Sequence, residues 1–239
     1  MKFREIFWVR NRAEMENWPD GKFLIEAVHY RAFAISRGDM MLSSSLLEAD
    51  ALLPDGADIV KACKWLKLPN APEEKIDGLD LVYFELERLK KKVANTVFFL
   101  GSTPEVAAVI KATLEQGRPW LRFISYSPTF KPFFTKSEDR AIIDAIHEAN
   151  PDLLLVDMGT PKQEKWLYYN WKELDIHCHT ATVSSFVAPF QALTDKAAGK
   201  FKGFRGFLTR LDQFFFDKVL YRCAFLWAVL REKQNQKSE

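Results

Sequence analysis

The chain has 239 residues, of which 48% are hydrophobic, enough for one large domain or for a domain with an appendage. Its formal net charge is only +2, so the overall charge gives no indication of nucleic-acid binding. Three widely spaced cysteines disfavour a disulfide framework and favour a reducing, cytoplasmic setting. The charged N-terminal residues do not resemble a signal peptide, and no uncharged apolar run approaches the ~18–20 residues of a membrane span.

Short segments rich in β-branched and aromatic residues predict five strands. In chain order they cover residues 22–30, 96–101, 121–127, 152–159 and 177–185. Apolar residues spaced three and four apart predict helices over residues 55–68, 79–92, 103–116, 137–150 and 161–174. This alternation is typical of an α/β fold with a Rossmann-like, largely parallel sheet and helices on both faces. We therefore expect ligands at the carboxyl ends of the strands.

The C-terminal residues differ in composition from the rest of the chain. We expect an α/β domain over residues 1–195 and a basic, aromatic helical appendage over residues 196–239. Residues 200–231 hold seven of the twenty phenylalanines and seven Lys or Arg residues against two acids. This mixture favours contact with anionic lipid headgroups. A plain packing role and a homo-oligomer interface are the alternatives.

One turn, Gly159-Thr160-Pro161-Lys162-Gln163, follows an apolar strand and precedes a helix. As a helix start it would have Thr160 as N-cap, Pro161 in the first position and Gln163 completing a capping box. As a ligand site it would offer a glycine for close approach, free N–H groups at the positive helix end and the charge of Lys162 for a phosphate. The residue types alone leave both interpretations open.

The longer string "LLLVDMGTPKQEKW" (residues 153–166) resembles the signature G-[AST]-P-x-Q-E-x-W of the WecG/TagA/CpsF family of bacterial glycosyltransferases. Three other segments resemble family segments in the same order. They are "EADALLPDGADIVKACKWL" at 48–66, "EEKIDGLDL" at 73–81 and "VFFLGSTPEVAAV" at 97–109. The resemblance covers roughly residues 40–175.

The resemblance implies an inverting transfer of a sugar from a nucleotide-sugar, expected to be UDP-linked, to a polyprenyl-diphosphate-linked acceptor. It implies a role in surface polysaccharide or teichoic-acid-type biosynthesis, at the inner face of the cytoplasmic membrane. The family works without a metal, and the relevant loops contain no DxD motif. Positive charge is then needed at the leaving diphosphate.

The resemblance also implies residue roles. Asp55 matches the family's catalytic base, although Asp55 could instead cap the helix that starts near Gly56. Asp50 is a second candidate for the base. The other implied positions are Gln163 as a catalytic residue that contacts a sugar, Gly101, Gly159, Thr160, Lys162, Glu164, Ser184 and Ser185 for the donor, and Lys75, Arg205, Arg210 and Arg222 for the acceptor or its lipid diphosphate.

Three segments depart from the family pattern. The family's Thr-x-Asn has no clear counterpart in "FLIEAVHYRAF", Lys75 replaces an arginine, and "VSSFVAPF" replaces G-G-x-F-D. These changes suit either an altered donor specificity or a non-catalytic member that binds a nucleotide-sugar or acts as a scaffold in a polysaccharide assembly complex. The absence of GxGxxG and P-loop patterns disfavours an unrelated nucleotide-dependent enzyme.

A metal site at His177 and His179 is a further possibility. Alternation along a strand places both histidines on one face, where one strand supplies only two ligands. Packed or half-exposed histidines are therefore the favoured interpretation.

Overall fold

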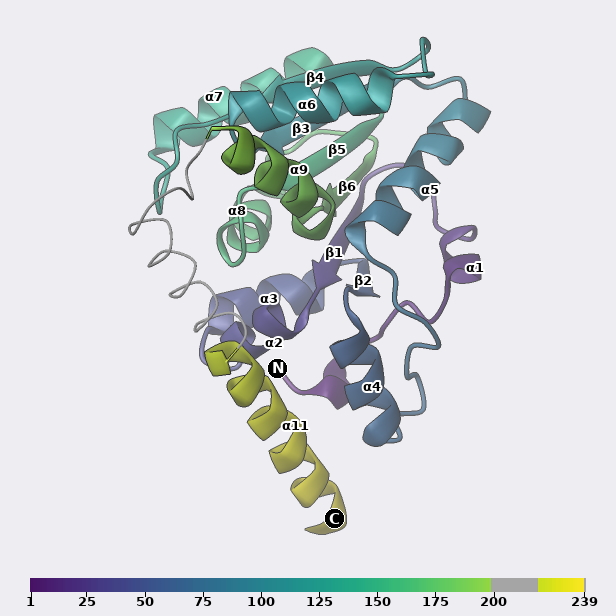
Figure 1. Cartoon of the computed structure of the whole chain (residues 1–239), viewed down its shortest axis with the longest axis vertical. Helices are drawn as coiled ribbons and strands as arrows, with labels where there is room; N and C mark the ends of the chain where they lie inside the picture. The colour runs from purple at the N-terminus through teal and green to yellow at the C-terminus, as the bar shows by residue number, and fades with distance from the viewer. Residues whose placement is uncertain (199–218, 239) are drawn as a thin grey trace.

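The structure, a computed structural model, describes residues 1–198 and 219–238. In these residues one sheet has six strands, all parallel, in the order β2-β1-β6-β5-β3-β4 (Figure 1). The strands are β1 (Phe23–Val28), β2 (Ala51–Pro54), β3 (Thr96–Gly101), β4 (Arg122–Tyr126), β5 (Leu153–Asp157) and β6 (His179–Thr182). The expected α/β fold with a parallel sheet and a C-terminal helix is confirmed.

Helices connect the strands and cover both faces of the sheet. They are a 3-10 turn η1 (Phe3–Glu5), α1 (Arg12–Met15), α2 (Tyr30–Ser36), α3 (Met40–Glu48), α4 (Ala57–Trp65), α5 (Gly78–Lys91), α6 (Pro104–Glu115), α7 (Lys136–Ala149), α8 (Lys162–Asn170), α9 (Ser184–Ala197) and α11 (Tyr221–Ser238). None of the helices in the described ranges combines the length and the apolar character needed to cross a membrane.

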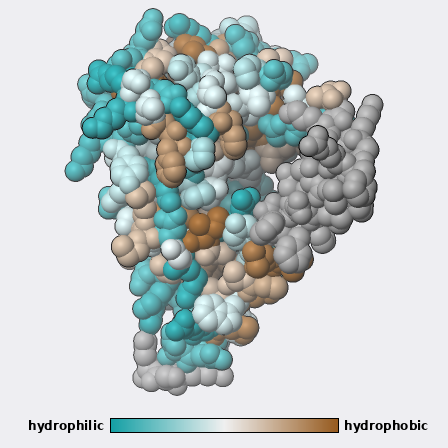
Figure 2. Space-filling model, turned by 90° about the vertical axis from the view of Figure 1, so that its left-hand side faces the viewer, coloured by the Kyte–Doolittle hydropathy of each residue, from teal (hydrophilic) through white to brown (hydrophobic). Residues whose placement is uncertain are grey.

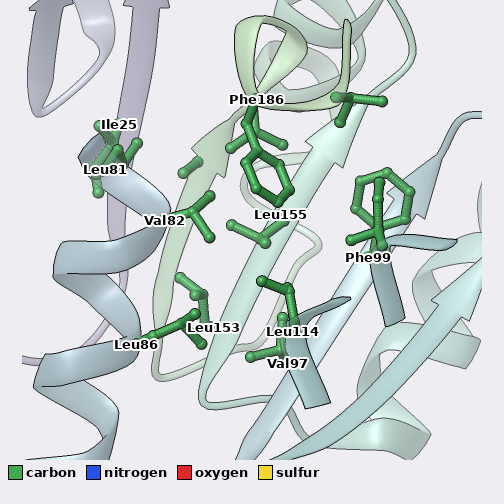
Figure 3. Close-up of a cluster of buried hydrophobic side chains, with 14 of the residues drawn as sticks. Ile25, Leu81, Val82, Leu86, Val97, Phe99, Leu114, Leu153, Leu155 and Phe186 are labelled. Carbon is green, nitrogen blue, oxygen red and sulfur yellow. The ribbon is translucent and has the colours of Figure 1, made fainter. Parts of the chain in front are cut away.

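The strands are apolar along their whole length because both faces of the sheet are buried. Leu153 and Leu155 face α5, α6 and α9, and Figure 3 shows Leu86 of α5 and Phe186 of α9 in the same cluster. The alternate residues, represented by Leu154, pack with α7 and α8 on the opposite face. Continuous burial of this kind is typical of parallel sheets with helices on both sides.

A third cluster of buried side chains attaches the C-terminal helix to the start of the chain. Phe225 of α11 lies 5.7 Å from Phe3 and 5.9 Å from Phe33, measured between ring centroids. The buried carboxylate of Glu232 accepts hydrogen bonds from the backbone N–H groups of Phe3 (3.0 Å) and Arg4 (3.1 Å). Helix α11 therefore packs on the core, and a domain boundary at residue 196 stays a prediction.

The surface mixes hydrophilic and hydrophobic residues. On the face shown in Figure 2, patches of hydrophobic residues interrupt the hydrophilic surface, most clearly near the middle of the view. Exposed apolar side chains on this face are therefore gathered in places rather than evenly scattered.

The elements differ from the expectation in several places: helices α2, α3 and α9 were not predicted, and two differences concern the sheet. Strand β6 ends at Thr182, so the predicted strand over residues 177–185 was wrong at its end, where Ser184 instead begins α9. Strand β2 was not predicted, because Ala51–Pro54 is only four residues long and contains no β-branched or aromatic residue.

The strand order creates a topological switch point between β3 and β5. The connection from β3 runs through α6 outward to β4, whereas the connection from β5 runs through α8 in the other direction to β6. Helix α6 packs on one face of the sheet and α8 on the other. The two connections diverge there, leaving a crevice at the carboxyl ends of these strands, which is where open α/β sheets bind ligands.

Candidate active site

A cavity of about 270 Å³ lies at this switch point. Three of the predicted donor residues line it, namely Gly101, Gly159 and Lys162. The other lining residues are Ser102, Thr103, Pro128, Phe130, Asp157, Met158 and Gln191. The structure therefore brings together turns that are about 60 residues apart in the sequence.

Gly101 allows β3 and β5 to approach closely at the base of the cavity. Its φ is +120°, and a Cβ atom at this position would lie 1.9 Å from the backbone oxygen of Asp157. The N–H of Ser102 donates to the same oxygen over 2.8 Å. Any side chain at residue 101 would push the two strands apart, so the glycine is required by packing.

Gly159 presents its backbone to open space. Its φ is +78°, and a Cβ atom there would meet no atom within 4 Å. The N–H groups of Gly159 and Thr160 donate no hydrogen bond to a described residue. Gly159 itself lines the cavity, whereas Thr160 follows it in the chain without lining the cavity. The free N–H of Gly159 suits the ligand interpretation of this turn.

The helix-start interpretation of the same turn was wrong in its details. The N-cap of α8 is Pro161, and Thr160 does not cap the helix with its side chain. The ligand interpretation also differs in one detail, because the N–H groups of Lys162 and Gln163 that it expected to be free both donate to the oxygen of Gly159, over 2.9 and 3.1 Å. The donors available to a ligand are therefore those before the helix and not those of its first turn.

Gln163 and Glu164 lie beneath the cavity, each about 1% exposed. The Oε1 atom of Gln163 accepts from the N–H of Met158 (3.2 Å), and its Nε2 atom donates to Glu164 Oε1 (3.1 Å). Thr160 donates its hydroxyl to the same Glu164 oxygen over 2.7 Å. In this arrangement the three side chains hold the turn in shape, and Gln163 does not line the cavity.

Lys162 lines the cavity, but its ammonium group is held by the β4–α7 loop. Its Nζ atom donates to the backbone oxygen of Lys131 (2.7 Å) and lies 3.7 Å from the centroid of the Phe134 ring. Burial lowers the pKa of Lys162, and the charge of Lys131 lowers it further. A bound anion would oppose both effects.

Ser184 links the cavity to the next part of the site. Its hydroxyl lies 3.0 Å from Asp157 Oδ1 and 3.0 Å from Gln163 Oε1, and with one hydrogen it donates to one of them. Burial raises the pKa of Asp157, which lies at the end of β5. If Asp157 is protonated, its O–H can donate to the Ser184 hydroxyl oxygen while Ser184 donates to Gln163 Oε1.

Ser185 continues this link to Asp55, the predicted base. The hydroxyl of Ser185 accepts from the N–H of Gly78 over 2.8 Å and forms a hydrogen bond with the Asp55 carboxylate. Burial raises the pKa of Asp55 to about 6, an effect that outweighs the hydrogen bond from Ser185. A carboxylate with this pKa is well placed to accept a proton near neutral pH.

The alternative role of Asp55 as a helix cap was wrong. Gly56 is the N-cap of α4, with a φ of +128°, and no side chain caps this helix start. The second candidate base, Asp50, lies at the opposite end of β2, where its Oδ2 atom accepts from the N–H of Leu24 over 2.8 Å. Asp50 therefore lies at the amino end of β2, away from the carboxyl ends of the strands where Asp55 and the cavity lie.

Two of the predicted acceptor residues lie near Asp55. The Nζ atom of Lys75 forms an ion pair with Asp77 Oδ2 (2.7 Å), and its charge also lowers the pKa of Asp55. Arg222 pairs with Asp58 over 3.0 Å, in the first turn of the helix that follows Asp55. The other two, Arg205 and Arg210, lie outside the described residues.

Two acids of the site, the buried Glu26 and the half-buried Asp157, were not singled out from the sequence. Glu26 is fully buried in β1, where its Oε2 atom accepts from the hydroxyl of Thr182 over 3.0 Å. Burial first, and then the negative charge of Glu164, raise its pKa well above the usual range. The available signal was the acid itself, since burying a carboxylate inside an apolar strand costs free energy and therefore indicates a specific role.

His179 is a packed histidine, as favoured from the sequence. Its Nδ1 atom lies 2.8 Å from Glu85 Oε1 and its Nε2 atom 2.8 Å from the backbone oxygen of Pro19. Within the described ranges no three or more His, Cys, Asp or Glu side chains are arranged to hold a metal ion.

Comparison with known proteins gives the family of the chain. The sequence model of the "Glycosyl transferase WecG/TagA/CpsF family" matches residues 14–189. Relatives from Staphylococcus aureus strains MRSA252, NCTC 8325 / PS 47 and COL are named N-acetylglucosaminyldiphosphoundecaprenol N-acetyl-beta-D-mannosaminyltransferase. Each is 32% identical over 120 residues, which are 50% of this chain and 44% of the relative. The family match covers most of the chain, including Asp55 and the turn at Gly159, and the chain therefore belongs to the WecG/TagA/CpsF family of glycosyl transferases.

Proposed function

We propose that the protein transfers a sugar from a nucleotide-sugar to a polyprenyl-diphosphate-linked acceptor, with inversion at the anomeric carbon. The family and the names of its relatives support this class of reaction and acceptor. The observation that carries the proposal is Asp55, a buried carboxylate with a pKa of about 6. Its partner Ser185 is the chain neighbour of Ser184, which lies 3.0 Å from Asp157 in the lining of the switch-point cavity.

In the proposed reaction, Asp55 takes the proton of the acceptor hydroxyl. The hydroxyl oxygen forms the new bond to the anomeric carbon while the bond from that carbon to the nucleotide diphosphate breaks on the opposite side. Inversion follows from this single displacement. A positioned general base contributes about 10²–10⁴-fold to such a step.

The leaving diphosphate would occupy the cavity between β3 and β5. The N–H groups of Gly159 and Thr160 supply donors, and Lys162 supplies positive charge from the cavity wall. Its ammonium would exchange the backbone oxygen of Lys131 for a phosphate oxygen, which is a stronger, charge-assisted partner. The donor would be UDP-linked, and the protein would work at a membrane surface that carries the acceptor lipid.

The direct test is transfer from UDP-N-acetylmannosamine to a synthetic N-acetylglucosaminyl-diphosphate lipid, the substrates suggested by the relatives' name. The Asp55→Asn variant is expected to lose at least about 100-fold in kcat/KM, because Asn cannot accept the proton. Asp50→Asn is the matched control, since Asp50 lies at the other end of the same strand and should retain activity.

Transfer by Asp55→Asn at the wild-type rate would contradict the assignment of the base. Binding of the donor by the wild-type protein without transfer to any lipid-linked acceptor would favour a non-catalytic member of the family instead.

A further inference from the structure

Two buried acids, Glu26 and Glu164, take no part in the proposed transfer of the sugar. Glu26 extends from β1, an interior strand of the sheet, and Glu164 lies in the first turn of α8. Their side chains are 0% and 1% exposed, and neither carboxyl group forms an ion pair with a residue in the described ranges. A buried carboxyl group without a cation needs other partners, because burying an unpaired charge costs free energy.

Each of the two carboxyl groups has one oxygen that accepts hydrogen bonds. The Oε2 atom of Glu26 accepts from the hydroxyl of Thr182 over 3.0 Å. The Oε1 atom of Glu164 accepts from the hydroxyl of Thr160 over 2.7 Å and from Nε2 of Gln163 over 3.1 Å. If either group carries a proton, the proton therefore belongs on its other oxygen.

The other two oxygens, Glu26 Oε1 and Glu164 Oε2, are buried and have no hydrogen-bond partner among the described residues. The two acids are neighbours beneath α3. The hydroxyl of Ser45, on that helix, donates to the backbone oxygen of Glu164 over 2.8 Å and lies beside the carboxyl group of Glu26. The negative charge of Glu164 is also one of the causes that raise the pKa of Glu26.

A single proton satisfies both free oxygens. If both acids were ionised, two like charges would be buried together and both oxygens would stay unpaired. If Glu26 Oε1 carries a proton and Glu164 is ionised, the O–H of Glu26 can donate to Glu164 Oε2. Glu164 is the ionised partner because it accepts two hydrogen bonds through Oε1, whereas Glu26 accepts one through Oε2.

We propose that Glu26 is a positioning residue of the donor site, which keeps its proton and donates it to Glu164. Glu164 is then held at both oxygens, and its Oε1 atom fixes the side chains of Thr160 and Gln163. Gln163 in turn accepts from the N–H of Met158, so the backbone on both sides of Gly159 keeps its shape. The inference deepens the proposed function and rests on it for the identity of the ligand at this turn.

Infrared spectroscopy tests for the proton itself. A protonated carboxyl group has a carbonyl band that a carboxylate lacks, so Glu26→Gln should remove such a band from the wild-type spectrum at pH 8. At this pH Asp55, with a pKa of about 6, is ionised and does not contribute. Glu85→Gln is the matched control and should remove no such band. Glu85 is equally buried, but it pairs with Arg88 over 2.9 Å and with His179 over 2.8 Å.

Calorimetry with UDP as the probe tests the positioning role. Glu26→Gln should bind UDP within about twofold of the wild-type protein, because its amide N–H replaces the carboxyl O–H as the donor to Glu164. Glu26→Met has a similar length but no donor, and it should bind UDP at least about tenfold more weakly. Rescue by glutamine but not by methionine separates the hydrogen bond from the filling of space.

Two results would overturn the proposal. One is a spectrum in which Glu26→Gln removes no carbonyl band, and this result decides even if Glu26→Met does not fold. The other is a folded Glu26→Met variant that binds UDP as tightly as the wild-type protein. Failure of the proposed function would show differently, as absence of sugar transfer by a wild-type protein whose spectrum and UDP binding follow these expectations.

Discussion

At the scale of single residues, burial of Asp55 links activity to stability. Its pKa is raised from 3.8 to about 6 in the folded protein, chiefly by burial. Because the folded protein binds this proton more tightly than the unfolded chain, the free energy of unfolding is highest at low pH. It falls as the pH rises from about 4 to 6 and Asp55 ionises. A rise of about two pKa units corresponds to about 3 kcal/mol.

The Asp55→Asn variant should therefore be more stable than the wild-type protein at neutral pH. We expect its advantage in the free energy of unfolding to grow between pH 4 and pH 6 and to stay constant above, at up to about 3 kcal/mol. Urea unfolding at several pH values measures this difference. A variant that is less stable than the wild type at pH 8 would show that ionised Asp55 stabilises the fold.

The same pKa predicts the pH dependence of sugar transfer. Only ionised Asp55 accepts a proton, so kcat/KM should rise about tenfold per pH unit below pH about 6 and level off above it. The pH profile of kcat/KM, measured with both substrates below saturation, reports the pKa of Asp55 in the free enzyme. A rate that is flat between pH 5 and pH 7 would exclude Asp55 as the base.

The sequence predicts some of these residues better than others. Asp55 and Gly159 lie in motifs, so they could be identified before the structure was known. The roles of Glu26 and Asp157 depend on their depth in the sheet, which is set by helices packed on both faces. For Gln163 the motif predicts a sugar contact, and this stays a prediction, while the structure shows its side chain buried and bonded to the N–H of Met158.

At the scale of elements, two glycines allow the cost of a steric clash to be distinguished from the cost of backbone strain. Gly101 and Gly159 both have positive φ values, but an added Cβ atom meets the oxygen of Asp157 only at Gly101. Gly159→Ala is expected to cost about 1–2 kcal/mol through backbone strain alone. Gly101→Ala should cost at least about 2 kcal/mol more, because β3 and β5 must separate. Equal losses in urea unfolding would show that the strands adjust freely.

The attachment of α11 to the N-terminal segment depends on Glu232. Each of its carboxylate oxygens accepts one backbone N–H, from Phe3 and from Arg4. A glutamine has only one such oxygen, so Glu232→Gln should lower the free energy of unfolding by about 1–3 kcal/mol. The exposed Glu87 provides the control, and Glu87→Gln should change stability by less than about 0.5 kcal/mol. Equal effects would mean that the contact contributes nothing.

The elements themselves were largely predictable. Five of the six strands in the described part of the chain have the β-branched and aromatic residues that mark buried strands. Strand β2 lacks them, and its place in the sheet comes from pairing with β1. The start of α9 was mistaken for the end of a strand, because Val183 and the two serines after it suit either structure.

At the scale of the whole molecule, the strand order decides which residues meet. Alternation of strands and helices predicts a parallel sheet, but nothing local indicates that β6 lies between β1 and β5. That arrangement brings Ser184 and Ser185, at the start of α9, between Asp55 and Asp157. Motifs therefore locate the two parts of the site that contain Asp55 and Gly159. That α9 lies between these parts could be known only from the fold.

The central claim is that a nucleotide diphosphate binds between β3 and β5, within reach of the groups joined to Asp55. A crystal structure of the protein with UDP tests it most directly. The account predicts diphosphate oxygens in the cavity, accepting hydrogen bonds from the N–H groups of Gly159 and Thr160, with Lys162 turned away from the oxygen of Lys131 and toward them. UDP bound elsewhere, with this cavity unchanged, would contradict it.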